Sequence, residues 1–381
     1  MVVCGYLSWW LLVSSSAGQP LRHYIKSIID DMISDRVQID KIQYQLSENI
    51  HNLENKILVE GKKRGGKLKS EVEIPDCKSF KNKTIKESLA ENVKIVSNYN
   101  FTHIGKYLQR LQLDTKGIFH LAQRKENSTA PTIVSGFSDN HYKEAIGLFN
   151  SINNPVRKMY PDLKFVVFDL GLTEEHRKTV QKLCNCDVRK FPFENYPSHM
   201  KFLRGFTWKP VIIQMMLQEF DFVMWVDSSI RLNKNVDRLF ERARYYGIQS
   251  LGGYGSIAVR THNILFDFLK EEPCMFNYPE VQGGWVAIKR SLFTLKVLLQ
   301  PWVSCALQYG CMDFPYSKAF LTCSSMTKLF HCHRSDQSVL GILLTRLFHV
   351  NRQLFVFNDG EFGNVRRDSI EKFIPQDSGH V

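Results

Sequence analysis

The stretch Phe220–Leu232, FDFVMWVDSSIRL, decides the fold class that we expect for this sequence. Its apolar run from Phe222 to Val226 carries no charge and stops at Asp227, a pattern typical of a parallel strand buried on both faces. Ligands bind at the carboxyl ends of strands in open α/β sheets, so the Asp227 carboxylate is a candidate partner for a divalent cation or a sugar hydroxyl. The alternative is a turn, in which Asp227 accepts hydrogen bonds from the amides of Ser228 or Ser229.

Strand-like and helix-like segments alternate on both sides of this stretch. The alternation predicts an α/β protein with a doubly wound, mostly parallel sheet. We expect Thr173 and Ser335 to cap two of the helices. The expected strands are 132–137, 163–170, 187–191, 222–226 and 280–290, and the expected helices are 142–152, 205–218, 236–246, 261–269, 291–307 and those that follow Thr173 and Ser335.

The first 17 residues, MVVCGYLSWWLLVSSSA, are apolar or small and uncharged. They end in small residues that suit a cleavage site, which predicts a secretory signal peptide. An uncleaved short signal-anchor is the alternative, although the run is marginally short for a membrane span. Both interpretations predict a protein of the secretory pathway, either in the Golgi lumen or secreted, with membrane association through the N-terminus in the second case.

Cysteines and glycosylation sequons agree with that destination. Nine cysteines are present, and removing Cys4 with the leader leaves an even number for disulfides, whose pairing the sequence leaves open. Asn82, Asn100 and Asn127 each begin an Asn-x-Ser/Thr sequon. A glycan must face solvent, so these three sequons predict an exposed, glycosylated region before residue 131.

The region before residue 131 is predicted to be a stem. Apolar residues from Leu21 to about Leu58 recur at steps of three and four, which predicts a stalk helix or short coiled coil that can self-associate. The domain organisation that we expect is a leader at 1–17, a helical and glycosylatable stem at 18–130, a folded body at 131–360 and a polar tail at 361–381.

The formal net charge of +12 is spread along the chain. No stripe of Lys and Arg with interleaved aromatic residues occurs in the sequence, so nucleic-acid binding is disfavoured. A mild preference for acidic partners or anionic membrane surfaces is the remaining consequence of the charge.

Three stretches together resemble the nucleotide-sugar glycosyltransferases of the GT-A fold. They are TIVSGFSDNHYKEAIGLFNSI at 132–152, RGFTWKPVIIQMMLQEFDFVMWVDSSIRL at 204–232, and the pair VQGGWVAIKR and RSDQSVLGILL at 281–290 and 334–344. More narrowly, the combination resembles a nematode-expanded domain family of uncharacterised function. The resemblance covers about residues 131–345 and implies a GT-A-like, Rossmann-like catalytic domain.

The resemblance also implies a donor-binding role for five residues. Gly136 and Asp139 would line the nucleotide pocket at the end of the first strand, and Lys209 would face the donor phosphates or ribose. Gly283 and Gly284 would let backbone amides approach the sugars. The sequence leaves two alternatives open, a solvated lysine near a helix start and a β-bulge at the paired glycines.

Two aspartates would carry the chemistry. The resemblance implies that Asp336 acts near the anomeric carbon, as a base or by stabilising positive charge there. The alternative for Asp336 is a first-turn acid favoured by the helix dipole. Asp227 would hold a metal ion or the donor ribose.

The family's metal-binding element has two carboxylates one residue apart, and here the second position is Ser229. Mn²⁺ or Mg²⁺ prefers oxygen ligands, so Asp227 with Ser229 offers one charged ligand and one weak ligand. His333 and His349 are candidates for a further ligand, with a structural histidine as the alternative for each. The cluster at 331–333 (His-Cys-His) suggests zinc, but a disulfide at its cysteine is the simpler explanation.

The resemblance therefore implies a glycosyltransferase, of hexosyltransferase type, that moves a sugar from a nucleotide-sugar donor to a glycan, lipid or protein hydroxyl. Two alternatives stay open. One is a catalytically inactive sugar-binding or cell-surface interaction protein on the same fold, which Ser229 favours. The other is a metal-independent transferase in which Arg231 and Lys209 neutralise the donor diphosphate.

Overall fold

A computed structural model describes residues 19–61, 85, 88–325, 327–357 and 361–375. The chain divides into two compact units, Met1–Glu48 and Asn49–Val381. The predicted leader and the Asn82 sequon lie outside the described residues. Helix α2 (Gln19–Gly61) covers the expected stem helix, and no helix in the described ranges is both long and apolar enough to cross a membrane.

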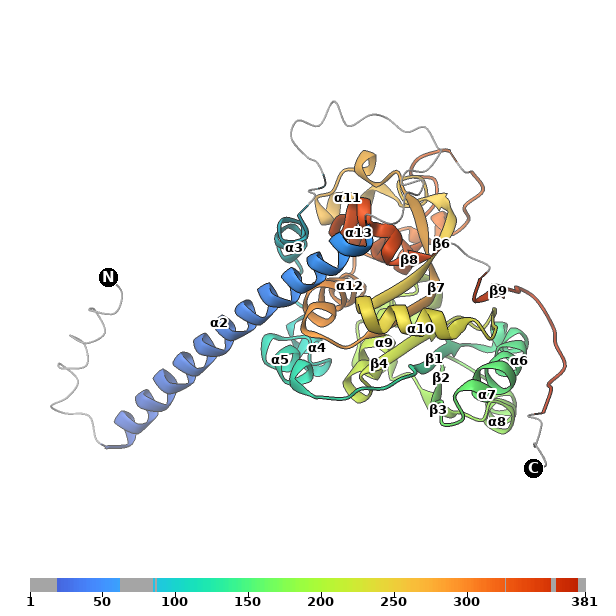
Figure 1. The fold of residues 1–381 in the computed structure, drawn as a ribbon, viewed down its shortest axis with the longest axis horizontal. Coiled ribbons are helices and arrows are strands. Elements are labelled where there is room, and N and C mark those ends of the chain that lie inside the picture. The colour runs from blue at the N-terminus through green and yellow to red at the C-terminus, as the bar shows by residue number, and fades with distance from the viewer. Residues whose placement is uncertain (1–18, 62–84, 86–87, 326, 358–360, 376–381) are drawn as a thin grey trace. The chain divides into compact units, whose positions relative to one another are not determined.

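The second unit is built on a mixed sheet whose strand order is β3-β2-β1-β4-β7-β6-β8 (Figure 1). Neighbours from β3 to β4 run parallel, β7 runs antiparallel to both of its neighbours, and β6 and β8 are parallel. The predicted doubly wound, mostly parallel sheet is therefore confirmed. The strands are β1 (Thr132–Phe137), β2 (Phe165–Asp169), β3 (Asp187–Lys190), β4 (Phe222–Val226), β6 (Ile248–Ser256), β7 (Pro279–Lys289) and β8 (Val356–Phe357).

Strand β4 lies in the middle of the sheet because both of its faces are apolar. All its side chains are buried, and they alternate between two cores. Met224 packs with residues of α6 and α10 in one core. Trp225 points to the other face, where its ring lies 5.7 Å from that of Trp208 in α9. The uninterrupted apolar run thus reflects helices on both faces of the strand.

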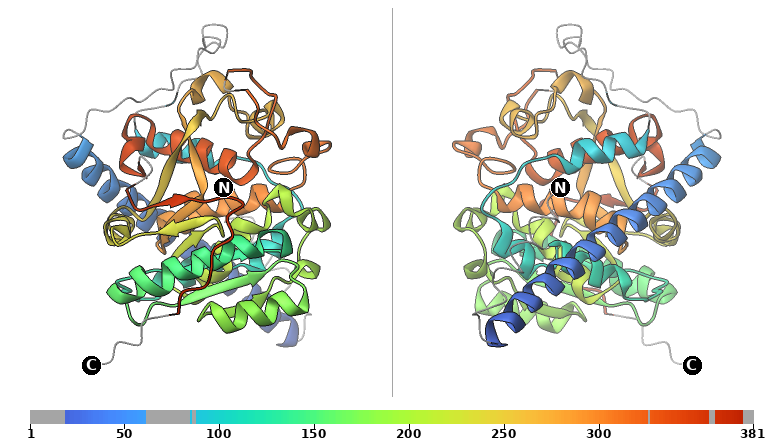
Figure 2. Two further views of the ribbon diagram at one scale, coloured as in Figure 1. Left: turned by 90° about the vertical axis from the view of Figure 1, so that its right-hand side faces the viewer. Right: turned by 90° about the vertical axis from the view of Figure 1, so that its left-hand side faces the viewer.

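Helices cover both faces of the sheet (Figure 2). Most of the expected helices are present, and the Thr173 hydroxyl caps α8 by accepting from His176 N at 3.3 Å. The helices are α3 (Leu89–Ser97), α4 (Gly105–Arg110), α5 (Thr115–Gln123), α6 (Tyr142–Ser151), α7 (Arg157–Met159), α8 (Glu174–Leu183), α9 (Trp208–Glu219), α10 (Val236–Tyr246), α11 (Asn263–Leu269), α12 (Gln300–Leu307) and α13 (Ser335–Phe348).

Three features differ from the sequence-based expectations. The cap predicted at Ser335 is wrong, because Arg334 occupies the cap position of α13 and Ser335 is its first residue, with φ of 41°. Strand β6 was not expected, since its sequence IQSLGGYGS is rich in glycine and polar residues. Within the expected polar tail, β9 (Gly363–Val365) pairs antiparallel with β5 (Ile230–Leu232), the short strand that follows Asp227.

The described disulfides join cysteines close in sequence: Cys184–Cys186, Cys305–Cys311 and Cys323–Cys332. They confirm that the chain is disulfide-bonded. Because Cys332 is paired, the cluster at 331–333 is explained without zinc, as expected. Asn100 and Asn127 are both exposed, as a glycosylated asparagine must be.

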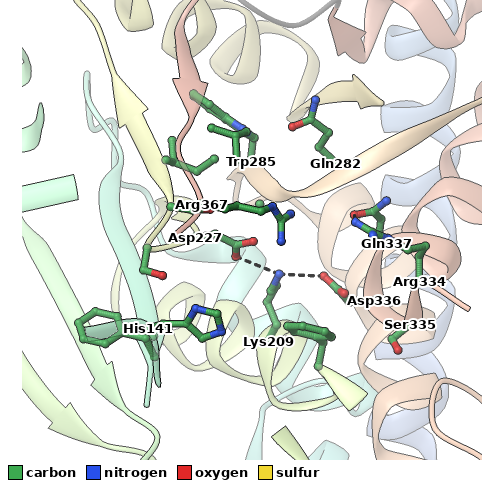
Figure 3. Close-up of a pocket in the computed structure, with 18 of the residues that line it drawn as sticks. His141, Lys209, Asp227, Gln282, Trp285, Arg334, Ser335, Asp336, Gln337 and Arg367 are labelled. Carbon is green, nitrogen blue, oxygen red and sulfur yellow. Dashed lines mark hydrogen bonds and ion pairs between the residues drawn. The ribbon is translucent and has the colours of Figure 1, made fainter. Parts of the chain in front are cut away.

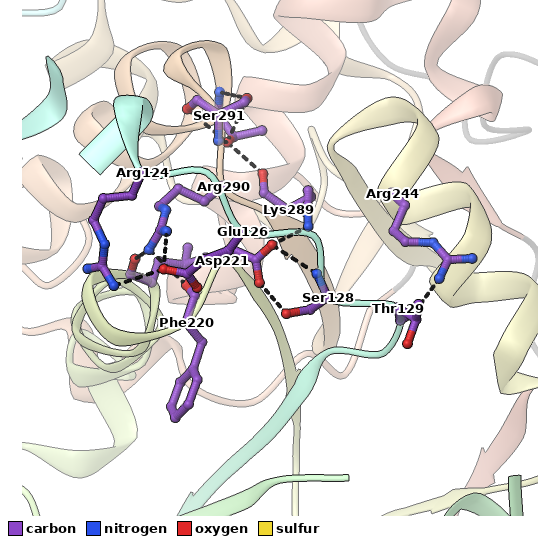
Figure 4. A network of polar contacts seen from close by, with 12 residues as sticks. Arg124, Glu126, Ser128, Thr129, Phe220, Asp221, Arg244, Lys289, Arg290 and Ser291 are labelled. Carbon is purple, nitrogen blue, oxygen red and sulfur yellow. Dashed lines mark hydrogen bonds and ion pairs between the residues drawn. The ribbon is translucent and has the colours of Figure 1, made fainter. Parts of the chain in front are cut away.

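A polar network anchors the segment before β1 at the end of the sheet opposite the carboxyl ends of β1 and β4 (Figure 4). Asp221, 2% exposed, accepts hydrogen bonds from Ser128 Oγ at 2.5 Å and from Lys289 Nζ. Burial opposes ionisation of Asp221, but Lys289 and Ser128 outweigh it and lower the pKa of this carboxyl. Asp221 therefore stabilises the fold in its ionised form.

We expect Asp221→Ala to lower the free energy of unfolding by about 3 kcal/mol at neutral pH, because Lys289 loses a buried partner. A group with a lowered folded-state pKa contributes its full stabilisation above its unfolded pKa and loses it as the pH falls. The deficit should therefore shrink toward acid pH. Urea unfolding at several pH values measures this loss of stability. The control is Glu174→Ala, which breaks an exposed ion pair with Lys178 and should cost less than about 0.5 kcal/mol. An unchanged deficit in acid would contradict the role of the ionised carboxylate.

Candidate functional site

A cavity of ≈ 800 Å³ opens at the carboxyl ends of β1 and β4 (Figure 3). Its walls come from the ends of these strands, the glycine-containing half of β7, the starts of α9 and α13, and the C-terminal segment around β9. The chain thus places a set of convergent polar groups at the sheet edge where α/β proteins bind ligands.

Lys209 joins two aspartates at the floor of this cavity. Its side chain is 3% exposed, and Nζ lies 3.0 Å from Asp227 Oδ1 and 3.0 Å from Asp336 Oδ2. Nζ also donates a hydrogen bond to the backbone oxygen of Gly283 at 3.2 Å. A cation in the first turn of a helix is disfavoured by the helix dipole, so the two acids account for its position.

The two aspartates differ in how readily they take a proton. Burial raises the pKa of Asp336, and the nearby Asp227 charge raises it further, against the opposing effect of Lys209. Burial also acts on Asp227, but Lys209 and the indole N–H of Trp225, 2.7 Å from Oδ1, lower the pKa of this carboxyl. Burial alone would lower the pKa of Lys209, yet the two carboxylates raise it. Asp227 therefore stays ionised, whereas Asp336 is the better proton acceptor.

The paired glycines of β7 make room for these carboxylates. A Cβ atom on Gly283 would lie 2.4 Å from Asp336 Oδ2, and one on Gly284 would lie 2.9 Å from Asp227 Oδ2. Gly284 lines the cavity, whereas the amide of Gly283 donates to Gln337 Oε1 at 3.4 Å. The groups that approach these glycines are the two acids. The alternative expected here, a β-bulge, is present, because the pairing of β6 with β7 shifts register between Ser250 opposite Val286 and Leu251 opposite Gln282.

The two residues predicted at the end of β1 have different surroundings. Gly136 lines the cavity, where a Cβ atom would meet the Trp225 ring at 3.2 Å. Asp139 is not among the lining residues. Its Oδ1 accepts from Thr173 N at 2.8 Å and from His176 Nδ1 at 2.9 Å, and these bonds lower the pKa of Asp139. Asp139 thus holds the start of α8.

The described residues around Asp227 make a poor set of ligands for a divalent metal ion. No group of three or more His, Cys, Asp or Glu side chains in the described ranges is arranged to hold a metal ion. Ser229 lines the cavity and adds only a hydroxyl. His333 lies within 3.0 Å of Met312 O through Nε2, and its burial lowers its pKa to about 4. His349 lies outside the cavity, and the cation between the two carboxylates is the Lys209 ammonium.

Several functional candidates carried no sequence signal that we recognised. Trp285 and Arg334 line the cavity, and so does Arg367, whose only signal was a pair of adjacent arginines in the expected tail. Arg231, which the metal-independent alternative placed near the donor diphosphate, is instead buried outside the cavity. Its guanidinium donates to the backbone oxygens of Ser228 at 3.0 Å and Glu144 at 2.9 Å.

The chain is similar to one family model and to several solved structures. A family model described as a protein of unknown function (DUF1647) matches residues 78–214. No curated protein has a matching sequence. Among solved structures, the mannosyltransferase Ktr4p from S. cerevisiae in complex with GDP is similar at 9% identity, with a TM-score of 0.38, over 83% of this chain and 85% of that chain.

Core-mannan synthase A from Aspergillus fumigatus, in its Mn/GDP form, is similar at 11% identity with a TM-score of 0.36, over 62% of this chain and 75% of that chain. The bifunctional glycosyltransferase WbbM is similar at 13% identity with a TM-score of 0.34, over 62% of this chain. The matched part spans 39% of the WbbM chain. The fold itself is established by the sheet order and strand directions of this chain.

We expect Gly283→Ala to destabilise the protein by about 1–3 kcal/mol, because its methyl group would displace the buried Asp336 carboxylate from Lys209. Gly105→Ala is the matched control, since a Cβ atom there meets nothing within 4 Å. Its effect should stay within about 0.5 kcal/mol. Chemical denaturation of both variants measures the difference. Equal stability of the two would show that the close approach at Gly283 is not a packing constraint.

Proposed function

We propose that this chain is a glycosyltransferase that moves a sugar, of the hexose class, from a nucleotide-sugar donor to a hydroxyl group of a glycan, lipid or protein. The observation that carries the proposal is the Asp227–Lys209–Asp336 arrangement on the floor of the cavity. It combines a carboxylate that stays ionised, a carboxyl that accepts a proton more readily, and a fixed cation. The sequence resemblance described above supports the same reaction.

The cavity suits a donor of this size and character. Its volume of ≈ 800 Å³ lies within the usual range for small-molecule sites. Apolar and aromatic walls, such as Trp285 and the exposed side of Phe206, alternate with the polar groups of the floor. A nucleotide-sugar combines flat apolar faces, many hydroxyls and a charged diphosphate, so it can use all three kinds of surface.

Sugar transfer breaks the bond between the anomeric carbon and the diphosphate oxygen, and that oxygen leaves with the bonding electron pair. The acceptor oxygen forms the new bond and loses its proton. In our proposal Asp336 takes that proton, because its raised pKa makes it a suitable base. The ionised Asp227 hydrogen-bonds donor hydroxyls and stabilises the positive charge that develops on the sugar. Lys209 holds both carboxylates in place.

In this proposal, protein cations neutralise the leaving diphosphate. Mn²⁺ or Mg²⁺ would have to use Asp227, whose Oδ1 already contacts Trp225 and Lys209, with Ser229 as a weak second ligand. The donor set is poor for such an ion, so no step of the proposed reaction runs through one.

The secretory pathway is the proposed location, in the Golgi lumen or outside the cell. The leader at 1–17, the disulfides and the exposed sequons at Asn100 and Asn127 support it. We also propose that the N-terminus can associate with a membrane and that the stem helix can self-associate.

A second candidate is a sugar-binding or cell-surface interaction protein without transferase activity. The presence of Ser229 at the second position of the metal-binding element favours it. That protein would bind glycans and would have no affinity for nucleoside diphosphates.

We expect nucleotide binding that does not depend on a metal ion. Thermal unfolding of the full chain, with a panel of nucleoside diphosphates and nucleotide-sugars, should reveal a donor that raises the midpoint. At a hundred times its dissociation constant the donor adds about 2.7 kcal/mol of stability. The shift should persist in chelator, because the cations of the site are side chains.

The outcomes of that experiment separate the candidates. A shift that appears only with manganese would contradict the metal-independent site. No shift with any nucleotide, combined with binding to immobilised glycans by the folded protein, would favour the second candidate instead.

We expect Asp336→Asn to lower the rate of sugar transfer by about 10²- to 10⁴-fold, because the amide cannot accept the acceptor's proton. Donor affinity should change far less, since Asn keeps the shape of the side chain. Measured turnover and donor dissociation constants give the two numbers. The matched variant Asp313→Asn changes another buried acid, which bonds Ser317 and lies outside this cavity, and it should keep its turnover. Equal losses in both variants would point to a structural role for Asp336.

A further inference from the structure

The segment 361–374, here termed the C-terminal strap, is built into the wall of the cavity. Its strand β9 pairs with β5, with Val365 opposite Ile230 and Gly363 opposite Leu232. The next amide, Arg366 N, donates to the backbone oxygen of Ser229 at 2.7 Å. The strap is thereby tied to the loop that carries Asp227.

Beyond β9 the strap runs past α6 and is anchored to it (Figure 2). Asp368 N donates to Glu144 Oε1 at 2.7 Å, and Ile374 N donates to Asn150 Oδ1 at 2.8 Å. The buried Arg231 adds two side-chain contacts to the strap: it donates to Ser369 Oγ at 2.9 Å and to Glu371 Oε1 at 2.8 Å. These contacts account for the burial of Arg231 in this chain.

Two glycines provide the space that the docked strap requires. A Cβ atom on Gly147 would lie 2.1 Å from Arg231 Nε, so the arginine fits only because α6 has no side chain there. Gly363 has φ of 154°, and a Cβ atom on it would lie 2.0 Å from the backbone oxygen of Arg231 and 2.8 Å from the Trp285 ring. Close docking therefore depends on both positions, which is typical of a specific contact.

The anchors on either side of Arg367 direct its side chain into the cavity. Figure 3 shows the Arg367 guanidinium above Lys209 and beside Asp227. The strap thus brings a cation close to the carboxylate that follows β4. The positive charge of Arg367 acts on Asp227. Within the described part of the chain, no carboxylate lies within the 4.0 Å ion-pair distance of this guanidinium, so its N–H groups can bind an anionic ligand.

The charges of the floor explain why such a cation is needed. Two carboxylates and one ammonium leave the floor with net negative charge when both acids are ionised, which would repel a diphosphate. Arg367 cancels that excess at the floor. Over the whole cavity lining, the four cations Arg204, Lys209, Arg334 and Arg367 balance the four acids Glu144, Asp227, Glu280 and Asp336. A guanidinium binds phosphate oxygens in a fork and keeps its charge at every physiological pH.

We propose that the strap is a permanent part of the active site and that Arg367 binds the diphosphate of the donor, acting as a fixed cation where a divalent ion would otherwise be required. This inference rests on the proposed function and adds the residue that recognises the leaving group. Arg367 is then a catalytic residue, because its contacts strengthen as negative charge grows on the departing oxygen.

The test compares Arg367→Gln with Arg366→Gln by calorimetric titration in the presence of chelator. The probe is the nucleoside diphosphate that stabilises the wild-type chain, with the same nucleoside without phosphates as a second ligand. We expect Arg367→Gln to weaken diphosphate binding by about 10- to 100-fold and to leave nucleoside binding unchanged. Arg366→Gln should behave as the wild type, since Arg366 is exposed, lies outside the cavity and holds the strap through its backbone amide.

Arg367→Lys separates charge from geometry. It should recover only part of the diphosphate affinity, because an ammonium cannot form the forked contact. Equal diphosphate affinity in wild type and Arg367→Gln would overturn the inference while leaving the proposed function intact. A wild-type chain that binds no nucleotide would instead overturn the proposed function, and this inference with it.

A variant of the anchors tests the strap itself. In the double variant Ser369→Ala and Glu371→Ala the cavity residues stay the same, but the strap loses its two side-chain contacts with Arg231. We expect faster tryptic cleavage after Arg367 and weaker diphosphate binding together, and bound diphosphate should slow the cleavage. Faster cleavage with unchanged diphosphate binding would contradict the strap's role in the site.

Discussion

The buried ion pair of Lys209 with two aspartates is the constraint on which the rest of the site depends. A buried ammonium is costly unless opposite charges and hydrogen bonds replace its water. Lys209 obtains them from the loop after β4, from the first turn of α13 and from the backbone of β7. The pair therefore joins a central strand, a helix and an antiparallel strand at one point, and the glycines at 283 and 284 are the steric consequence.

This arrangement also decides what chemistry the site can perform. Two carboxylates that share one cation acquire different proton affinities, because Asp227 also accepts from the Trp225 indole whereas Asp336 is more deeply buried. A divalent ion bound between two acids neutralises a leaving group in many enzymes. Here the ammonium takes that place, so in the reaction that we propose the charge of the departing diphosphate falls to cations fixed in the chain. Arg367 on the C-terminal strap is in a position to be one of these cations.

The sheet and the C-terminal strap form different walls of the cavity. The carboxyl ends of β1 and β4 supply a rigid edge, because these strands are buried on both faces and cannot shift without breaking two cores. The strands of the sheet do not form the opposite wall of the cavity, which β9 supplies by pairing with β5. Arg231 lies outside the cavity and bonds the strap at Ser369 and Glu371, so it helps to keep Arg367 in place within the cavity.

The sequence by itself determined the central strand, its helices and the position of Asp227, because period and capping are local properties that a short window records. Asp227 was found in this way, whereas Gly136 and Asp336 were implied by the resemblance, and the structure brings all three to one cavity. The sequence did not show that Lys209 bridges two acids, that Asp139 holds the start of α8, or that Arg231 is buried. It also missed β6, whose glycine-rich sequence becomes a strand only through pairing with β7 and β8. The contribution of residues 361–374 was decided only by tertiary structure, since a polar segment shows its partners only when distant parts of the chain meet.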